Sequence, residues 1–238
     1  ADDWLAYNQT FGKGDPILAM FEHINGMARD IAAMEILGPN PGATVEWLKQ
    51  IVQTDHAMRA GTMKNRNEFM GSEVQGRTIG IVGLGNVGRR IAELCRTLFG
   101  MQVLACDPFL DEKEIAARGA TKVELDELLR RADFVSINCP LDDDSRGMIG
   151  AKQFALMQPH AYFITTARGS IHDEKALEEA LRDKRIAGAG LDVWEKEPPP
   201  ADHPLLKFDN VIASPHTAGV TREARENMGR IAAEQVIM

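Results

Sequence analysis

The chain is short of cysteine, and this shortage excludes two classes of protein. Its three cysteines, Cys95, Cys106 and Cys139, are odd in number and form no CxxC pair. Neither a disulfide framework nor a zinc-binding pattern is therefore expected. Cys106 and Cys139 lie inside apolar, strand-like runs and are predicted to act as small buried hydrophobic residues. Reduced thiols and a cytoplasmic location follow as the expectation.

Long apolar runs and basic clusters are also missing. No stretch approaches eighteen apolar residues, so no membrane span is expected. The start, ADDWLAYNQT, has neither the basic nor the apolar part of a signal peptide. The net charge of -8, without a long basic run, argues against a nucleic-acid-binding surface. A local basic pocket for an anionic substrate is still compatible with this charge.

Histidines are few, and five of the six show no spacing typical of a metal site or a catalytic triad. We expect these five to be surface or hydrogen-bonded residues: His23, His56, His160, His172 and His203. No metal is therefore predicted.

What the chain does have, from Gly76 onward, is a regular alternation of strand-like and helix-like segments. At 238 residues, 44% of them hydrophobic, it can bury one large core. The predicted strands are 77–85, 102–108, 134–140, 161–169, 187–193 and 210–216, and the predicted helices are 86–99, 125–132, 173–185 and 221–237. Asp173 is predicted to cap its helix. Short, nearly continuous apolar strands separated by helices indicate a doubly wound α/β fold with a parallel sheet buried on both faces.

The first 75 residues are less regular. One or two amphipathic helices are expected between 16 and 37, followed by a strong helix stop at Gly38-Pro-Asn-Pro-Gly42. Helical spacing returns at 45–58, and a polar loop is expected over 60–75.

The segment Gly83-Leu-Gly85-Asn-Val-Gly88 fits GxGxxG between a predicted strand and a predicted helix. The first glycine permits a tight turn, the second lets the backbone approach a pyrophosphate, and the third lets helix and strand pack closely. Asp107 ends the next strand, 19 residues beyond Gly88, where a carboxylate accepts hydrogen bonds from the adenosine ribose. Because it would repel a 2′-phosphate, NAD is favoured over NADP. A glycine turn without a ligand, with Asp107 as a solvated strand end, and a flavin or another adenosine ligand are the alternatives.

Three polar residues follow the later strands, at the edge where open α/β sheets bind ligands. Arg168 suits the carboxylate of an anionic substrate. His216 suits acid–base chemistry near neutral pH, and Glu197 would stabilise its protonated form. Taken singly, they could also be a structural ion pair, a strand-end histidine and a solvated loop charge.

Four segments, VGLGNVG, TTARGSIHDEKAL, IAGAGLDVWEKEP and NVIASPHTAG, stand in one order between about 72 and 237. In this order and spacing they resemble the D-isomer-specific 2-hydroxyacid dehydrogenases, which include glyoxylate/hydroxypyruvate reductases and phosphoglycerate dehydrogenases. The resemblance implies a Rossmann domain that binds NAD. It also implies hydride transfer between the nicotinamide and C2 of a 2-hydroxy or 2-keto acid.

The resemblance also implies a role for individual residues. Arg168 would hold the substrate carboxylate and carbonyl, His216 would be the general acid/base, and Glu197 would orient His216 and raise its pKa. The implied cofactor-binding residues are Gly83, Gly85, Asn86, Val87, Gly88, Asp107, Pro140, Thr166, Ala167, Asp192 and Gly219. Of these, Asn86 and Val87 would offer backbone amides to the pyrophosphate, and Asp192 would contact the nicotinamide carboxamide.

The chain departs from the family pattern in two places. Thr165 stands where the family usually has Asn. The glycine-containing loop with which the family's other domain grips the substrate carboxylate is not found in residues 1–43, and the chain stops at Met238, where the family returns to that domain. We therefore expect residues 1–45 to be a reduced or incomplete substrate-domain segment and residues 46–238 to be the NAD-binding domain.

The function predicted first is that of an NAD-dependent 2-hydroxyacid dehydrogenase or 2-ketoacid reductase. Its partners would be a small anionic substrate and, by the resemblance, a second copy in a homodimer. The alternatives are an NAD(H)-binding regulatory module similar to the C-terminal-binding-protein corepressors, and a fragment that only binds NAD.

Overall fold

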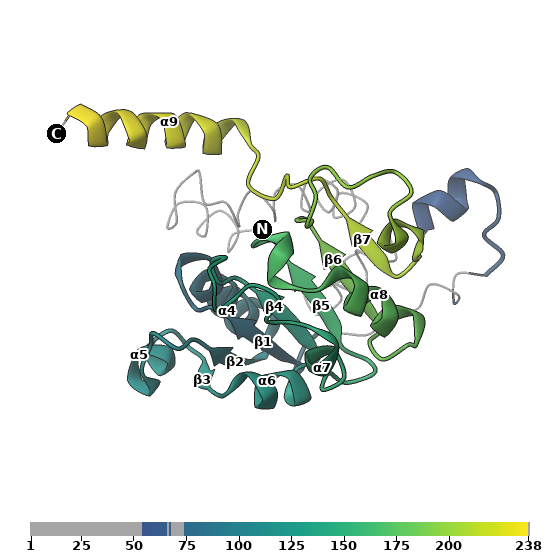
Figure 1. Ribbon diagram of the computed structural model, residues 1–238, viewed down its shortest axis with the longest axis horizontal. Helices are drawn as coiled ribbons and strands as arrows, with labels where there is room; N and C mark the ends of the chain where they lie inside the picture. The colour runs from purple at the N-terminus through teal and green to yellow at the C-terminus, as the bar shows by residue number, and fades with distance from the viewer. Residues whose placement is uncertain (1–53, 66, 68–73, 238) are drawn as a thin grey trace. The chain divides into compact units, whose positions relative to one another are not determined.

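The computed structural model describes residues 54–65, 67 and 74–237 (Figure 1). The chain divides into two units, which are described separately. One unit is Pro39–Pro215, and the other joins Ala1–Gly38 to His216–Met238. The predicted helices between 16 and 37 and the stop at 38–42 lie outside the described residues. Residues 54–59 are helical and are followed by a turn and irregular backbone to residue 65, as predicted for that part of the chain.

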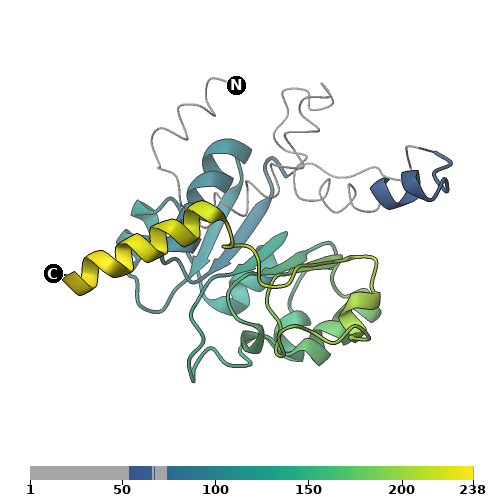
Figure 2. The same cartoon turned by 90° about the horizontal axis from the view of Figure 1, so that it is seen from above.

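A seven-stranded parallel sheet forms the centre of the unit Pro39–Pro215 (Figures 1 and 2). The strands are β1 (Thr78–Val82), β2 (Gln102–Cys106), β3 (Thr121–Lys122), β4 (Phe134–Ile137), β5 (Tyr162–Thr165), β6 (Gly188–Leu191) and β7 (Val211–Ala213). Their order is β3-β2-β1-β4-β5-β6-β7. The chain therefore runs outward from β1 in one direction and resumes at β4 in the other. Ligands bind at such a switch point, beyond the carboxyl ends of the strands.

Helices alternate with these strands. They are α4 (Asn86–Phe99), α5 (Glu112–Ala117), α6 (Leu125–Arg131), α7 (Ala151–Phe154) and α8 (Glu174–Arg182), with 3-10 turns η3 (Gly169–Ile171) and η4 (Pro204–Lys207). The other unit contributes α9 (Arg222–Ile237). In the described part of the chain, no helix combines the length and the apolar character needed to cross a membrane.

The structure confirms the predicted fold class and most of the predicted elements. Helix α4 has the predicted bounds, and Asp173 caps α8 by accepting hydrogen bonds from the backbone N–H groups of Lys175 and Ala176. Three short elements, α5, β3 and α7, were not predicted. The sequence does carry a signal for α5, because Asp111 and Glu114 form a reciprocal capping box at its start.

The centre of the sheet is buried on both faces, as predicted, whereas Ile212 and Ala213 of the edge strand β7 are exposed. Gly80 and Ile81 are successive residues of β1 and so point to opposite faces. A Cβ on Gly80 would lie 2.3 Å from Cδ2 of Leu128 in α6. On the other face, a Cβ on Gly88 of α4 would lie 3.1 Å from Cγ2 of Ile81. These close approaches fix α6 and α4 on opposite sides of β1, each over its own hydrophobic cluster.

Candidate functional site

The loop between β1 and α4 contains two glycines that the fold itself requires. Gly83 has φ +87°, and a Cβ there would lie 2.6 Å from the backbone nitrogen of Cys139. A Cβ on Gly88 would lie 2.1 Å from the carbonyl oxygen of Gly83. Any side chain at either position would therefore displace backbone.

Gly85, the middle glycine of the motif, is different. No heavy atom lies within 4 Å of the position that a Cβ would take there. It is the N-cap of α4, makes no side-chain cap, and no acidic residue lies in the first turn of the helix. The N–H groups of that turn, including those of Asn86 and Val87, need acceptors, and the helix dipole favours an anion. An open glycine before an uncapped helix start fits the pyrophosphate of a dinucleotide.

Asp107 is buried beside this loop rather than solvated at a strand end. Its Oδ2 accepts a hydrogen bond from the backbone N–H of Leu84 (2.8 Å), and its Oδ1 accepts from that of Phe109 (3.0 Å). Nη1 of Arg118 donates to the carbonyl oxygen of Leu84 (2.5 Å). Both the backbone N–H and the carbonyl oxygen of Leu84 are therefore hydrogen-bonded to side chains. Because Asp107 is buried, the alternative that it is a solvated strand end is wrong. The carboxylate keeps lone pairs free for ribose hydroxyls.

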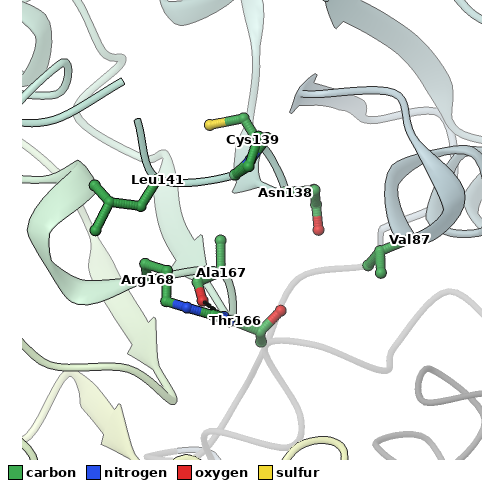
Figure 3. A pocket seen from close by; sticks show the side chains of 8 residues that line it. Val87, Asn138, Cys139, Leu141, Thr166, Ala167 and Arg168 are labelled. Atoms are coloured by element: carbon green, nitrogen blue, oxygen red, sulfur yellow. Dashed lines mark hydrogen bonds between the residues drawn. The ribbon is translucent and has the colours of Figure 1, made fainter. Parts of the chain in front are cut away.

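A pocket of about 590 Å³ opens at the carboxyl ends of neighbouring strands (Figure 3). It is lined by Val87, Asn138, Cys139, Pro140, Leu141, Thr166, Ala167 and Arg168. These residues come from the first turn of α4 and from the segments that follow β4 and β5. The structure thus brings five of the predicted site residues to one pocket, at the switch point of the sheet.

Asn138 is a pocket residue that the sequence analysis missed. Its Nδ2 donates to Oγ (3.0 Å) and to the carbonyl oxygen (3.2 Å) of Ser136. Its Oδ1 is buried and has no hydrogen-bond partner among the described residues. Figure 3 shows this oxygen pointing into the space between the labelled side chains. A buried acceptor without a donor fits a ligand that brings an N–H or O–H group. The position could have been found as the first residue beyond β4.

Cys139 also lines the pocket but is not a nucleophile. Burial raises the pKa of its thiol to about 11, and burial raises the pKa of Cys95 to about 12. Cys106 has its pKa raised by burial as well. All three thiols are therefore protonated at neutral pH. Cys106 and Cys139, predicted to be buried, are partly buried, and Cys95 is buried.

Arg168 is exposed on the wall of the pocket. Its Nη1 donates to the carbonyl oxygen of Ala167 (2.6 Å), the dashed contact of Figure 3. No acidic side chain of the described residues forms an ion pair with it, so the structural-ion-pair alternative is not supported. The guanidinium keeps donors for a carboxylate.

Asp192 and Glu197 lie beyond β6. Asp192 is buried, and its Oδ1 accepts from Oγ of Ser214 (2.6 Å). Glu197 accepts, through Oε1, a hydrogen bond from the backbone N–H of Trp194 (3.1 Å). Glu197 is exposed, and this hydrogen bond folds its carboxylate back on its own loop.

His216 and Gly219 belong to the other unit. Their place beside the pocket therefore stays a prediction. Within its unit, His216 has φ +56°. Residues other than glycine rarely adopt this backbone conformation, and such strained positions concentrate at functional sites.

One prediction about the histidines is wrong. His172 is 3% exposed, and neither ring nitrogen has a hydrogen-bond partner within the described residues. Its ring packs against that of Phe163, with centroids 5.3 Å apart. Burial lowers its pKa to about 4, so the neutral imidazole serves as an aromatic core residue. His203 and His160 are hydrogen-bonded to Glu174 and Asp133, as expected. The described residues hold no group of three or more side chains suited to a metal ion.

Comparison with known proteins identifies the family of this fold. Residues 42–218 match the family model described as D-isomer specific 2-hydroxyacid dehydrogenase, NAD binding domain. The chain is 42% identical over 189 residues to D-3-phosphoglycerate dehydrogenase of Archaeoglobus fulgidus, covering 79% of this chain and 36% of the relative. It is 40% identical over 192 residues to glyoxylate reductase of Korarchaeum cryptofilum, covering 79% and 58%.

Among solved structures, D-lactate dehydrogenase with NAD+ from Lactobacillus jensenii superposes with a TM-score of 0.72 at 30% identity, covering 94% of this chain and 65% of that one. The chain thus belongs to the D-isomer specific 2-hydroxyacid dehydrogenase family, and the matched part is the family's NAD-binding domain. It spans less than two thirds of the length of these relatives.

Proposed function

We propose that this chain carries the cofactor half of an NAD-dependent oxidoreductase that moves a hydride between nicotinamide and C2 of a 2-hydroxy or 2-keto acid. The observation that carries the proposal is the shared pocket. Arg168 and Val87 both line this pocket. Arg168 has an exposed guanidinium without a carboxylate partner in the described residues, and Val87 lies at the uncapped start of α4. A cation for a small acid and a helix start for a pyrophosphate thus meet in one pocket.

The residues of the loop and the pocket would hold the cofactor by its polar groups. The backbone N–H groups of Asn86 and Val87 would donate hydrogen bonds to the pyrophosphate, since Gly85 leaves open space in front of them. Asp107 accepts from the ribose hydroxyls, and Asn138 Oδ1 accepts from a further N–H or O–H of the ligand. When bound, the nicotinamide ring supplies or takes up the hydride. Thr166, Ala167 and Pro140 shape the cleft around it.

The remaining residues would act on the substrate. Arg168 binds the carboxylate and so orients C2, which lowers the entropic part of the barrier. By the family resemblance, His216 would donate or accept the proton of the C2 oxygen, and Glu197 would be its partner. Asp192 and Gly219 contribute to the cofactor side of the cleft.

The finer assignments rest on the family resemblance. We propose that residues 46–238 form the NAD-binding domain, that residues 1–45 belong to a substrate domain, and that the protein works as a cytoplasmic homodimer. Homologues named glyoxylate reductase and D-3-phosphoglycerate dehydrogenase support a small hydroxy or keto acid as the substrate class.

Oxidation of NADH with glyoxylate, hydroxypyruvate and pyruvate tests the proposal. We expect His216→Ala to lower kcat by about 10²- to 10⁴-fold, because it removes the general acid. Arg168→Ala should raise KM and lower kcat, and Arg168→Lys should restore part of the loss, since it keeps the charge without the two parallel donors. Arg185→Ala is the matched control, an exposed arginine just before the amino end of β6 that should change neither constant.

A chain that binds NADH but turns over none of these acids would contradict the enzyme proposal and leave the regulatory-module alternative. Equal activity of wild type and both Arg168 variants would show that this side chain does not bind the substrate.

A further inference from the structure

Trp194, just beyond β6, is buried and makes contact with the segments that follow β5 and β7. The first contact is with Gly169, the residue after Arg168. A Cβ on Gly169 would lie 2.0 Å from the carbonyl carbon of Trp194 and 2.4 Å from the backbone nitrogen of Glu195. The backbone after β5 therefore rests directly on the Trp194–Glu195 peptide, at a distance that only glycine allows.

The second and third contacts are hydrogen bonds. The backbone N–H of Trp194 donates to Oε1 of Glu197 (3.1 Å), which fixes the direction of that carboxylate. The indole Nε1–H donates to the carbonyl oxygen of Ser214 (3.0 Å), which lies just past β7 and two residues before His216 in the chain. The backbone of Trp194 thus contacts the segment after β5 and Glu197 beyond β6, and its indole side chain reaches the end of β7.

The loop that carries Trp194 is itself held in place. The backbone N–H of Glu195 donates to Oε1 of Glu174 (2.8 Å), at the start of α8. Oε2 of Glu174 is 3.1 Å from Nε2 of His203, whose Nδ1 accepts from the backbone N–H of Leu205 (3.3 Å). Since Nδ1 accepts, Nε2 is the protonated nitrogen and donates a hydrogen bond to Oε2 of Glu174. The His203 ring also packs edge-on against the indole, with centroids 5.3 Å apart.

We propose that Trp194 is a positioning residue, which sets the ends of β5, β6 and β7 at fixed separations. Those ends carry Arg168, Glu197 and the chain leading to His216, so the inference rests on the proposed function of these three residues. The indole suits the task because its ring fills the core while its N–H reaches a carbonyl. A phenylalanine could fill much of the same space but could not donate to Ser214.

Trp194→Phe is the informative substitution because it removes the indole N–H and keeps an aromatic ring. We expect kcat with the best keto acid to fall by about 10- to 100-fold, since a small misplacement of reacting groups is costly. The Kd for NADH should stay unchanged, because the glycine loop and Asp107 are untouched. Phe154→Leu is the matched control, a substitution in the same hydrophobic cluster, where the ring packs edge-on against Phe163 within β5. It should lower the melting temperature without the loss in kcat.

Hydrogen–deuterium exchange provides a readout that does not need turnover. In Trp194→Phe the amide of residue 194, which donates to Glu197, should exchange faster, and in Phe154→Leu it should not. Unchanged exchange at this amide, or equal loss of kcat in the two variants at equal stability, would overturn the positioning role. If wild type lacks turnover while the exchange difference is present, the proposed function fails and the structural link through Trp194 stands.

Discussion

His172 shows how a titratable residue can be used as an apolar one. It lies between the buried Ile171 and the polar Asp173, and its ring is buried against Phe163 and lacks hydrogen-bond partners within the described residues. Burial lowers its pKa from 6.5 to about 4, although nearby Glu174 and Asp173 oppose the shift. A charged imidazole in that position would therefore cost free energy that a neutral one does not.

His172 should make the fold sensitive to acid. The unfolded chain takes up a proton near pH 6.5, whereas the folded chain does so only near pH 4, so stability is complete above 6.5 and is lost as the pH falls between these values. From pH 7 to pH 5 the loss due to this residue is roughly 2 kcal/mol. We expect His172→Leu to remove that part of the pH dependence, as measured by urea unfolding at both values.

Other titrating groups are common to the two proteins, so their contribution cancels in the difference between wild type and His172→Leu. A difference in unfolding free energy that is the same at pH 7 and pH 5 would show that His172 is not held neutral by the fold.

Single residues of the site differ in how far the sequence could reveal them. Arg168 and Asp107 could be predicted, because their types match a chemistry and they follow strands. Asn138 could have been found as the first residue beyond β4, although its unpaired oxygen appears only in the structure. Trp194 could not, since its partner Ser214 lies beside it only once the strands are assembled. The burial of His172 was missed for the same reason, because a histidine carries no pattern that separates surface from core.

At the scale of elements, the glycine loop and α4 contain glycines of two kinds, one required for packing and one that faces open space. Gly88 is needed for packing, as a Cβ there would meet the carbonyl oxygen of Gly83 at 2.1 Å. Gly85 faces open space and has φ -71°, which alanine also adopts. The two positions should therefore respond differently to the same substitution.

We expect Gly85→Ala to change the unfolding free energy by no more than about 0.5 kcal/mol, as is usual away from close contacts. It should weaken NADH binding at least 10-fold, because the new methyl group stands where the pyrophosphate must approach. Gly88→Ala should instead destabilise the fold by about 1–3 kcal/mol through overpacking. Fluorescence titration with NADH and urea unfolding measure the two effects. Full NADH affinity in a well-folded Gly85→Ala variant would place the pyrophosphate elsewhere.

The bounds of the elements show where sequence patterns reach their limit. Helix α4 could be predicted to the residue because the glycine motif precedes it and Gly100, with φ +60°, ends it. Strands β4 and β5 end earlier than predicted, at Ile137 and Thr165. The residues beyond them are no longer hydrogen-bonded in the sheet and line the pocket instead. The two-residue β3 and four-residue α7 are too short to show any period.

At the scale of the whole molecule, the order of elements was enough to predict the fold class. Alternating strands and helices with apolar strands leave few arrangements besides a parallel sheet covered on both faces, and the two hydrophobic clusters on either side of β1 agree with it.

Binding of the cofactor should stabilise the described domain as a unit, because the loop, Asp107 and the pocket belong to the folded state only. At a concentration of 100 times Kd, NADH should add about 2.7 kcal/mol to the unfolding free energy. NADPH at the same concentration should add less, since its 2′-phosphate would meet the Asp107 carboxylate. Thermal unfolding with each nucleotide tests this, and an equal or larger shift with NADPH would contradict the assignment to NAD.

The hydrogen bond between Asp107 and Leu84 has a consequence for engineering. Replacing that aspartate is an obvious route to a protein that accepts NADP, but its carboxylate also anchors the glycine loop through the backbone N–H of Leu84. A substitution by a small apolar or a basic residue would remove the repulsion and the anchor together. A redesign should therefore retain an acceptor at this position, as Asn or Ser does, and introduce the new positive charge from a neighbouring residue.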